Sequence, residues 1–425
     1  MINIDELIIY RNFEDDDVLR CAVEALNTED DEKRRALMFG AAGRLIELAG
    51  IYGFRGNLWH DYLTLLLVNN ENTFSRACEM RGIEKSTLKT LALHDFMVFR
   101  ELFRCDLSAL TGDSGAMILQ TLLDYEAPEC SGQAFNKRIR DCICELAERL
   151  AKSSGIEEFA DNIIDFYRCF GVGKLGLHKA FRIDRGESGA VIVPITNIAH
   201  VTLDDLVGYE SAKKKLTDNT EAFLKGKRAN NCLLFGDAGT GKSSSIKAIL
   251  NKYYDDGLRI IEVYKHQFKD INEIISQIKN RNYKFILYMD DLSFEEFETE
   301  YKYLKAVIEG GLEKKPQNVL IYATSNRRHL IKEEFSDRDG WSGDVHKTDT
   351  VQEKLSLAAR FGVTIYFGSP DKKQFQEIVR ELARRDDIKL PEEELLLRAN
   401  RWELDHGGFS GRCARQFVDY LLGTQ

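Results

Sequence analysis

A glycine-rich stretch that follows a short apolar run constrains the fold of this 425-residue chain more than any other part of it. Gly236–Ser243, with the sequence GDAGTGKS, fits the pattern G-x-x-x-x-G-K-[ST], and Cys232–Phe235 before it predicts a buried strand. Glycines let backbone N–H groups converge on phosphate oxygens, and Lys242 can neutralise the β- and γ-phosphates. The Ser243 hydroxyl can bind Mg²⁺, and the helix expected over 243–253 adds its positive N-terminal end. The residues that we expect to bind ATP or Mg²⁺ here are Gly236, Asp237, Ala238, Gly239, Thr240, Gly241, Lys242, Ser243 and Ser244.

From about residue 200 onward, apolar runs of four to seven residues alternate with helical patterns. This alternation predicts an α/β domain in three layers, with a parallel sheet covered by helices on both faces. After Pro370 only helical patterns remain, over about 371–386, 392–404 and 409–422, which predicts a helical lid subdomain. The candidate strands are Cys232–Phe235, Leu258–Val263, Phe285–Met289, Val319–Ala323 and Val363–Phe367.

In the first part of the chain, apolar residues recur at helical spacing, and there is no internal repeat. Further along, 181–195 predicts two short strands around a Gly-Glu-Ser-Gly turn, which would form a ribbon that joins two domains. We therefore expect four parts: a mainly helical N-terminal domain over 1–175, a ribbon or linker over 176–199, a nucleotide-binding α/β domain over 200–370 and the lid over 371–425.

Composition narrows the function classes. The net charge is −10, which argues against broad nucleic-acid binding, because that function needs a basic face. No apolar stretch reaches the roughly 18 residues that a membrane helix needs, and the first residues do not form a signal-peptide pattern. The nine cysteines are scattered, as expected of free thiols in a reducing compartment. We therefore expect a cytoplasmic protein.

Two adjacent carboxylates, Asp290 and Asp291, follow the strand expected at Phe285–Met289. An acid that ends a buried strand after a phosphate-binding loop is where a Mg²⁺-organising aspartate is expected, and Asp290 is the better candidate. Asp291 can orient and polarise an attacking water. The alternative for Asp291 is electrostatic stabilisation of a helix expected over 294–308.

Four polar residues later in the chain complete the candidate site. Asn326 follows the strand expected at Val319–Ala323 and can hold the attacking water, or it can simply favour a turn. Arg360 ends a helix that Thr350 opens with a capping box, and it can reach a phosphate in a neighbouring subunit. Arg412 or Arg415 can reach the nucleotide from the last helix. Each arginine, taken singly, can also be a surface residue in an ion pair.

Six motifs in this order together resemble the AAA+ ATPases, and several of them resemble the DUF815 family of ATP-binding AAA+ proteins. The resemblance covers about 200–425 and rests on LDDLVGYESAKKKL, GDAGTGKS, YMDDLSF, YATSNRR, LAARFG and GFSGRCARQF.

The resemblance implies a role for each matching residue. Val207 and Gly208 would lie near the adenine, Asp290 would be the Walker B metal ligand, and Asn326 would be sensor 1. Arg360 would be an arginine finger that acts in trans in a homo-oligomer. Arg412, with Arg415 as its rival, would be sensor 2. Many AAA+ proteins have Asp-Glu where this chain has Asp290-Asp291. The initiator and helicase-loader branch often has Asp-Asp and still hydrolyses ATP, so the resemblance implies that this chain hydrolyses ATP too, at a rate that the shorter side chain would lower.

The favoured hypothesis is an AAA+ ATPase that couples Mg²⁺-dependent ATP hydrolysis to the remodelling or assembly of a partner, which the N-terminal domain would recognise. The main alternative is a nucleotide-gated binding or scaffold module with incidental hydrolysis. A P-loop kinase and a DNA-associated ATPase like a helicase loader are less favoured. The polar stretch 334–350, which contains Trp341, is either a contact loop for a subunit or substrate or a surface loop.

Overall fold

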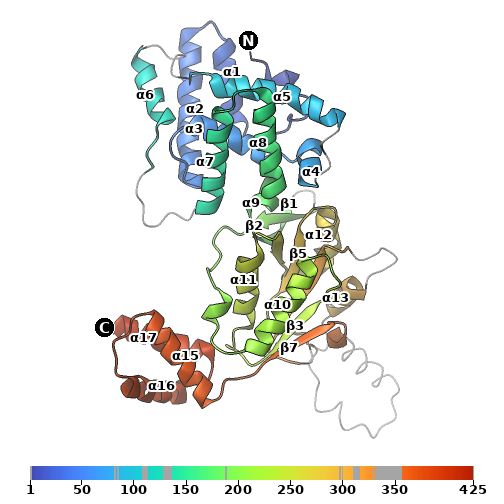
Figure 1. Cartoon of the computed structure of the whole chain (residues 1–425), viewed down its shortest axis with the longest axis vertical. Helices are drawn as coiled ribbons and strands as arrows, with labels where there is room; N and C mark the ends of the chain where they lie inside the picture. The colour runs from blue at the N-terminus through green and yellow to red at the C-terminus, as the bar shows by residue number, and fades with distance from the viewer. Residues whose placement is uncertain are drawn as a thin grey trace. The chain divides into compact units, whose positions relative to one another are not determined.

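The computed structural model describes residues 2–80, 83, 86–107, 113–127, 136–186, 189–295, 298, 300–309, 316–328, 330 and 357–424. The chain divides into two compact units (Figure 1). We call Met1–His178 with Pro194–Asn197 the N-terminal unit, and Lys179–Val193 with Ile198–Gln425 the C-terminal unit.

The N-terminal unit is helical. Its long helix α3 is apolar almost all round, and it is contacted by α2, α5, α6 and α7, as expected for a helix at the centre of a bundle. The apolar residues of α7 recur at helical spacing, and Ile139, Ile143, Leu146 and Leu150 form its buried face. The helices are α1 (Asp17–Asn27), α2 (Asp31–Tyr52), α3 (Leu58–Asn69), α4 (Thr73–Glu79), α5 (Thr87–Arg104), α6 (Asp113–Leu123), α7 (Lys137–Ala151), α8 (Ile156–Cys169) and α9 (Gly173–Leu177), preceded by the 3₁₀ turn η1 (Ile4–Glu6).

A buried carboxylate fixes the start of the chain to this bundle. The Asp95 side chain on α5 is fully buried, and it accepts hydrogen bonds from the backbone N–H groups of Ile8, Ile9 and Tyr10 at 2.9, 2.7 and 2.9 Å. Three donors are enough to compensate a buried carboxylate. The segment before α1 is therefore part of the packed unit.

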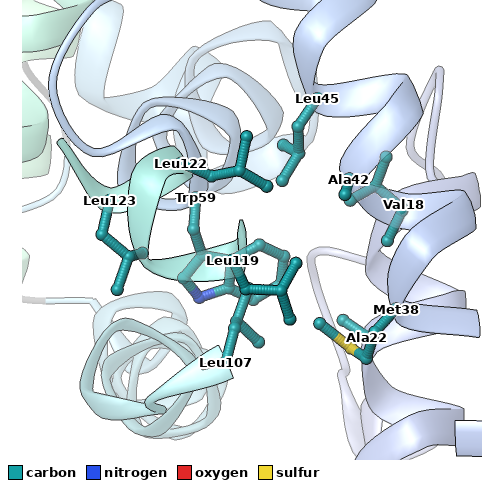
Figure 2. Close-up of a pocket in the computed structure, with 11 residues that line it drawn as sticks. Val18, Ala22, Met38, Ala42, Leu45, Trp59, Leu107, Leu119, Leu122 and Leu123 are labelled. Carbon is teal, nitrogen blue, oxygen red and sulfur yellow. The ribbon is translucent and has the colours of Figure 1, made fainter. Parts of the chain in front are cut away.

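The bundle encloses a small gap next to Trp59 (Figure 2). Its volume of about 10 Å³ is at the lower limit for one water molecule, and its apolar lining offers a water no polar partner. It is a packing gap and not a binding site. The side chains around it include Val18, Met38, Leu45, Trp59, Leu107, Leu119 and Leu122.

The C-terminal unit contains the predicted parallel sheet, in the order β2-β1-β4-β5-β6-β3-β7. The fold class predicted from the sequence is confirmed. The central strands of the sheet are largely apolar runs in the sequence, because both faces of the sheet are covered and the side chains on both faces are buried. The strands are β1 (Ala180–Gly186), β2 (Gly189–Pro194), β3 (Cys232–Gly236), β4 (Leu258–Glu262), β5 (Lys284–Met289), β6 (Val319–Ser325) and β7 (Val363–Phe367).

The β1 and β2 strands differ from their expected role as a ribbon between domains. The β1 strand pairs in parallel with β4, so the two strands extend one edge of the sheet. The reason is the alternation of Phe181 and Ile183, whose side chains are both buried. A linker would leave this apolar face in water.

Helices complete this unit, and the last three form the lid. The lid has its own apolar core, which includes Phe375, Val379, Ala414 and Val418, and Val207 packs against it. The elements are η3 (Leu203–Asp205), α10 (Glu210–Leu224), α11 (Lys242–Tyr253), η4 (Lys265–Asp270), α12 (Ile271–Ile278), α13 (Glu300–Glu309), α15 (Lys372–Arg385), α16 (Glu392–His406) and α17 (Gly411–Thr424).

Three sequence predictions concern segments that the structure describes only in part or not at all. The helix expected over 294–308 begins at Glu300 in the structure. The capping box at Thr350 and the polar stretch 334–350 with Trp341 lie outside the described residues. None of the helices in the described parts of the chain is both long enough and apolar enough to cross a membrane.

The N-terminal unit should lose stability as the pH rises, because of Asp61. Burial raises the pKa of this carboxyl to about 7, and the Cys144 thiol donates to it at 3.5 Å. The folded chain therefore binds the proton more tightly than the unfolded chain. Its free energy of unfolding should fall between about pH 4 and pH 7, by on the order of 4 kcal/mol, and then level off.

Urea unfolding of the full chain, followed through Trp59 fluorescence after Trp341→Phe and Trp402→Phe, measures this decline. Asp61→Asn should flatten it. The same slope in Asp61→Asn and in the parent would contradict the assignment.

Candidate nucleotide-binding site

The phosphate-binding loop, Gly236–Ser243, joins β3 to α11, and two of its glycines stand where a side chain does not fit. Gly236 has a φ of +138°, and a Cβ atom on it would lie 2.0 Å from the carbonyl oxygen of Phe367. Gly239 has a φ of +74°, and its Cβ would lie 3.0 Å from the Cβ of Arg412. The loop therefore lies tightly between the end of β7 and the start of α17.

Lys242 is buried at the inner end of this loop. Its Nζ donates to the carbonyl oxygens of Gly236 and Asp237 at 2.8 and 2.6 Å, and to Oδ1 of Asn326 at 3.0 Å. Burial lowers the pKa of Lys242, while the negative charges of Asp237 and Asp291 oppose that shift. The ammonium group thus has three oxygen partners, and it lies beside the ends of β3 and β6.

Asp290 ends β5 and receives three hydroxyl hydrogen bonds on one carboxylate oxygen. Ser243, Tyr288 and Thr324 all donate to its Oδ1, at 2.7, 2.7 and 2.6 Å. Burial alone would raise the pKa of Asp290, but these hydrogen bonds hold it below its ordinary value. The carboxylate is therefore ionised at neutral pH and fixed in orientation.

Asp291 adopts a left-handed backbone conformation, with a φ of +49°. Such a conformation costs about 1–3 kcal/mol in a residue other than glycine, so neighbouring contacts must hold it. The Asp291 N–H donates to Thr324 Oγ1 at 2.9 Å, and its Oδ1 accepts from Asn326 Nδ2 at 2.7 Å. Because Asn326 also accepts from Lys242, its amide bridges the lysine and the carboxylate.

These groups meet in a cavity of about 690 Å³, a size typical of small-molecule sites. The carboxyl ends of β5, β6 and β3 form its floor, because neighbouring parallel strands end at the same edge of the sheet. The cavity brings together most of the predicted site residues. Its lining is Val201, Asp205, Leu206, Val207, Tyr209, Ala238, Gly239, Thr240, Gly241, Lys242, Ser243, Ser244, Asp290, Asp291, Thr324, Asn326, Ile378, Leu382, Gly411, Arg412 and Arg415.

Three predicted nucleotide-binding residues are not part of this lining. Gly236 lies beneath the loop, against Phe367. The Asp237 carboxylate accepts hydrogen bonds from the N–H and the hydroxyl of Ser369, at 2.7 and 2.9 Å, in the connection between β7 and α15. The negative side chain of Asp237 therefore faces Ser369 and does not line the cavity. Gly208 lines a neighbouring polar depression of about 460 Å³.

The predicted arginines occupy different places. Arg360 forms an ion pair with Glu309 at the end of α13 and does not line the cavity. Arg415 lines the cavity, but its Nη1 pairs with Asp386 Oδ2 at 2.6 Å. Arg412 also lines the cavity, and it has no ion-pair partner among the described residues. Its backbone N–H donates to the Gly239 carbonyl at 3.2 Å, so it is the better placed of the two sensor candidates.

Sequence reasoning missed several residues of the site, among them Tyr288, which donates to Asp290, and the lining residue Thr324. Tyr288 and Thr324 each precede a predicted site residue by two positions in a strand, so the alternation of side chains could have placed them on the same face. Ile378 and Leu382 carried no such signal. They line the cavity only because of where the lid packs.

The residues present fit Mg²⁺. The Asp290 carboxylate and the Ser243 hydroxyl are hard oxygen donors within hydrogen-bond distance of each other. Magnesium usually takes one or two protein ligands and completes its shell with phosphates and water. In keeping with so small a protein contribution, no group of three or more His, Cys, Asp or Glu gathers in the described part of the chain.

The strand order, the phosphate-binding loop and the helical lid define the class of this protein as a P-loop NTPase of the AAA+ superfamily. A family model described as "Protein of unknown function (DUF815)" matches residues 176–425, more than half of the chain. The chain therefore belongs to the DUF815 family.

Comparisons with curated proteins and solved structures are more distant. A segment of 71 residues is 39% identical to the replication factor C large subunit of Staphylothermus marinus, over 16% of each chain. A segment of 104 residues is 38% identical to AAA-ATPase At1g43910 of Arabidopsis thaliana, over 22% of this chain and 21% of that protein. The chain thus spans about a fifth or less of the length of these relatives. A mutant of Thermotoga maritima RuvB is similar at a TM-score of 0.36 and 18% identity, over 51% of this chain and 64% of that chain.

Removing the Tyr288 hydroxyl should weaken the binding of Mg²⁺ at the nucleotide site. Tyr288→Phe keeps the ring and removes one of three donors to Asp290, so the carboxylate is less firmly oriented. We expect the Mg²⁺ concentration that gives half-maximal binding of ATP to rise about three- to tenfold. A Mg²⁺ titration of nucleotide binding, without turnover, measures this shift. Tyr303→Phe, which changes an exposed tyrosine of α13, is the matched control, and equal effects of the two changes would refute the assignment.

Proposed function

We propose that this protein binds ATP and hydrolyses it with Mg²⁺, and that it couples the cycle to the remodelling or assembly of a partner. The observation that carries the proposal is the convergence of Lys242, Ser243, Asp290, Asp291 and Asn326 on one cavity. A cation, a metal-binding pair and a second carboxylate are the groups that phosphoryl transfer to water requires.

Each side chain has a separate task in this proposal. Lys242 binds the β- and γ-phosphates, for which it must exchange its present carbonyl partners. Ser243 and Asp290 hold Mg²⁺, which neutralises charge on the phosphate oxygens when it is bound. Asp291 accepts a proton from the attacking water, and Asn326 fixes the orientation of that carboxylate.

Arg360 supports the proposal of a homo-oligomer. It lies outside the cavity of its own chain, and its side chain is fixed by Glu309. An arginine held at the surface, just before β7, can reach a phosphate bound by a neighbouring copy. The N-terminal unit has none of the residues proposed for the nucleotide site, so we assign it the recognition of the protein partner.

A specific observation favours a second candidate, a nucleotide-gated switch with slow turnover. Asp291 is one methylene shorter than glutamate, and its carboxylate is already bonded to Asn326. Both features limit its reach toward a water at the γ-phosphate. Single-turnover hydrolysis that is much slower than nucleotide exchange would favour the switch over the motor.

Lys242→Ala should abolish the proposed activity. We expect nucleotide affinity and Mg²⁺-dependent turnover each to fall at least tenfold, because the proposal assigns the binding of the β- and γ-phosphates to this buried ammonium group. Calorimetry and a phosphate-release assay measure the two effects. Lys247→Ala changes an exposed lysine on the same helix and should leave both values unchanged. Undiminished ATP binding in Lys242→Ala would rule out the proposed site.

Arg360→Ala should lose turnover at least tenfold while it keeps its affinity for ATP, because the proposed finger acts on the neighbouring site. A mixture of Arg360→Ala and Lys242→Ala chains should recover part of the activity, since some interfaces then combine an intact loop with an intact finger. Glu309→Gln, which removes this ion pair and keeps Arg360, is the control and should retain turnover. A mixture with no activity above the sum of its components would exclude action in trans.

A further inference from the structure

Four apolar side chains of the cavity lining come from two separate elements, and we call the space between them the apolar slot. One wall is the segment before α10, which contributes Leu206 and Val207, and the other is the lid helix α15, which contributes Ile378 and Leu382. Val207 also packs against the core of the lid. The width of the slot therefore depends on how α15 is held against the segment.

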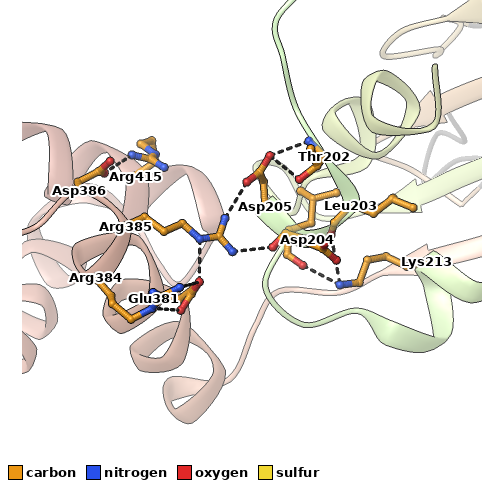
Figure 3. Close-up of polar contacts among 11 residues, drawn as sticks. Thr202, Leu203, Asp204, Asp205, Lys213, Glu381, Arg384, Arg385, Asp386 and Arg415 are labelled. Atoms are coloured by element: carbon orange, nitrogen blue, oxygen red, sulfur yellow. Dashed lines mark hydrogen bonds and ion pairs between the residues drawn. The ribbon is translucent and has the colours of Figure 1, made fainter. Parts of the chain in front are cut away.

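Arg385, at the end of α15, makes that connection (Figure 3). Its Nη1 donates to Asp205 Oδ1 at 2.8 Å, and its Nη2 donates to the backbone oxygen of Asp204 at 2.7 Å. Its Nε donates to Glu381 on the same helix at 2.7 Å, which orients the guanidinium. Within the described residues, no other ion pair joins the lid to the rest of the C-terminal unit.

The segment that Arg385 binds is itself firmly held. The second oxygen of Asp205 accepts hydrogen bonds from the N–H and the hydroxyl of Thr202, at 2.6 and 2.9 Å. From α10, Lys213 Nζ donates to the carbonyl oxygen of Leu206 at 2.8 Å. The guanidinium thus joins α15 to a fixed piece of the wall, within the network drawn in Figure 3.

Two further sets of hydrogen bonds, from α17 and from the connection between β7 and α15, reach the phosphate-binding loop. The Arg412 N–H donates to the Gly239 carbonyl at 3.2 Å, and Ser369 donates to Asp237 at 2.7 and 2.9 Å. These bonds would remain if Arg385 were removed. Loss of Arg385 should therefore open the slot without detaching the lid from the phosphate-binding loop.

We infer that Arg385 is a positioning residue for the nucleoside end of the ligand: it sets the spacing of the apolar slot that receives the flat base. This inference rests on the proposed function. An aromatic base gains affinity from apolar walls on both of its faces only if the walls stand at a fixed spacing. Phosphate oxygens gain nothing from apolar walls, so we expect the binding of pyrophosphate to depend little on Arg385.

Arg384 provides a matched control in the adjacent position. It pairs with the same partner, Glu381, at 2.7 and 2.9 Å, and within the described residues it forms no hydrogen bond or ion pair with 202–206. Replacing either arginine with alanine removes one positive charge from the same turn of α15. Only the Arg385 change removes the bonds to Asp204 and Asp205.

The test compares the binding of ADP and of inorganic pyrophosphate, both with Mg²⁺, because neither undergoes the proposed hydrolysis. Calorimetry on the full chain gives the dissociation constants for wild type, Arg385→Ala and Arg384→Ala. In Arg385→Ala we expect ADP to bind three- to tenfold more weakly and pyrophosphate to change less than twofold, as suits a partly exposed charged contact. Arg384→Ala should change neither constant more than twofold. Arg385→Lys, which keeps the charge but cannot form all three bonds, should be intermediate for ADP.

Three results would overturn the inference while the proposed function stands. They are equal losses for ADP and pyrophosphate in Arg385→Ala, equal losses of ADP affinity in Arg384→Ala and Arg385→Ala, or a wild-type chain that binds ADP no more tightly than pyrophosphate. A wild-type chain that binds neither ADP nor ATP would overturn the proposed function and this inference with it.

Discussion

The hydroxyl of Thr324 is the interaction on which the rest of the site depends. It donates to Asp290 and accepts from the N–H of Asp291, so one side chain of β6 fixes both acids at the end of β5. Two positions further along, Asn326 connects Asp291 to Lys242. Three neighbouring strands thus share one hydrogen-bonded chain. This chain is possible because parallel strands bring their carboxyl ends to one edge of the sheet.

Much of the sheet and of this chain could be predicted from the sequence. Short apolar runs in the sequence were enough to predict the strands β3 to β7. An acid or an amide placed after such a run was enough to predict Asp290 and Asn326 as candidate site residues. The pairing of β1 with β4 could not be predicted, since no local pattern states which distant strand an edge strand will join. The direction of the Asp237 side chain depends on Ser369, 132 positions later in the chain. The contact between Arg385 and Asp205 spans 180 positions and depends on the packing of the lid.

The phosphate-binding loop contacts the end of β7, the connection that follows it and the start of α17. Gly236 lies against Phe367, Asp237 binds Ser369, and Gly239 binds Arg412. A movement of the loop that accommodates phosphates would therefore act directly on the connection between β7 and α15 and on α17, the last helix of the lid. Because these contacts are direct, the movement would not have to be transmitted through the sheet. This coupling would serve a motor and a switch equally well.

The carboxylate of Asp95 has a consequence for the beginning of the chain. Its charge is balanced by the N–H groups of Ile8, Ile9 and Tyr10, which belong to a segment without regular secondary structure. A shortened chain that started after Tyr10 would remove three donors from this buried carboxylate and leave it with the His94 ring nitrogen at 3.1 Å, at a cost of at least about 1–3 kcal/mol. The segment before α1 thus supplies most of the hydrogen-bond donors that compensate a carboxylate inside the bundle.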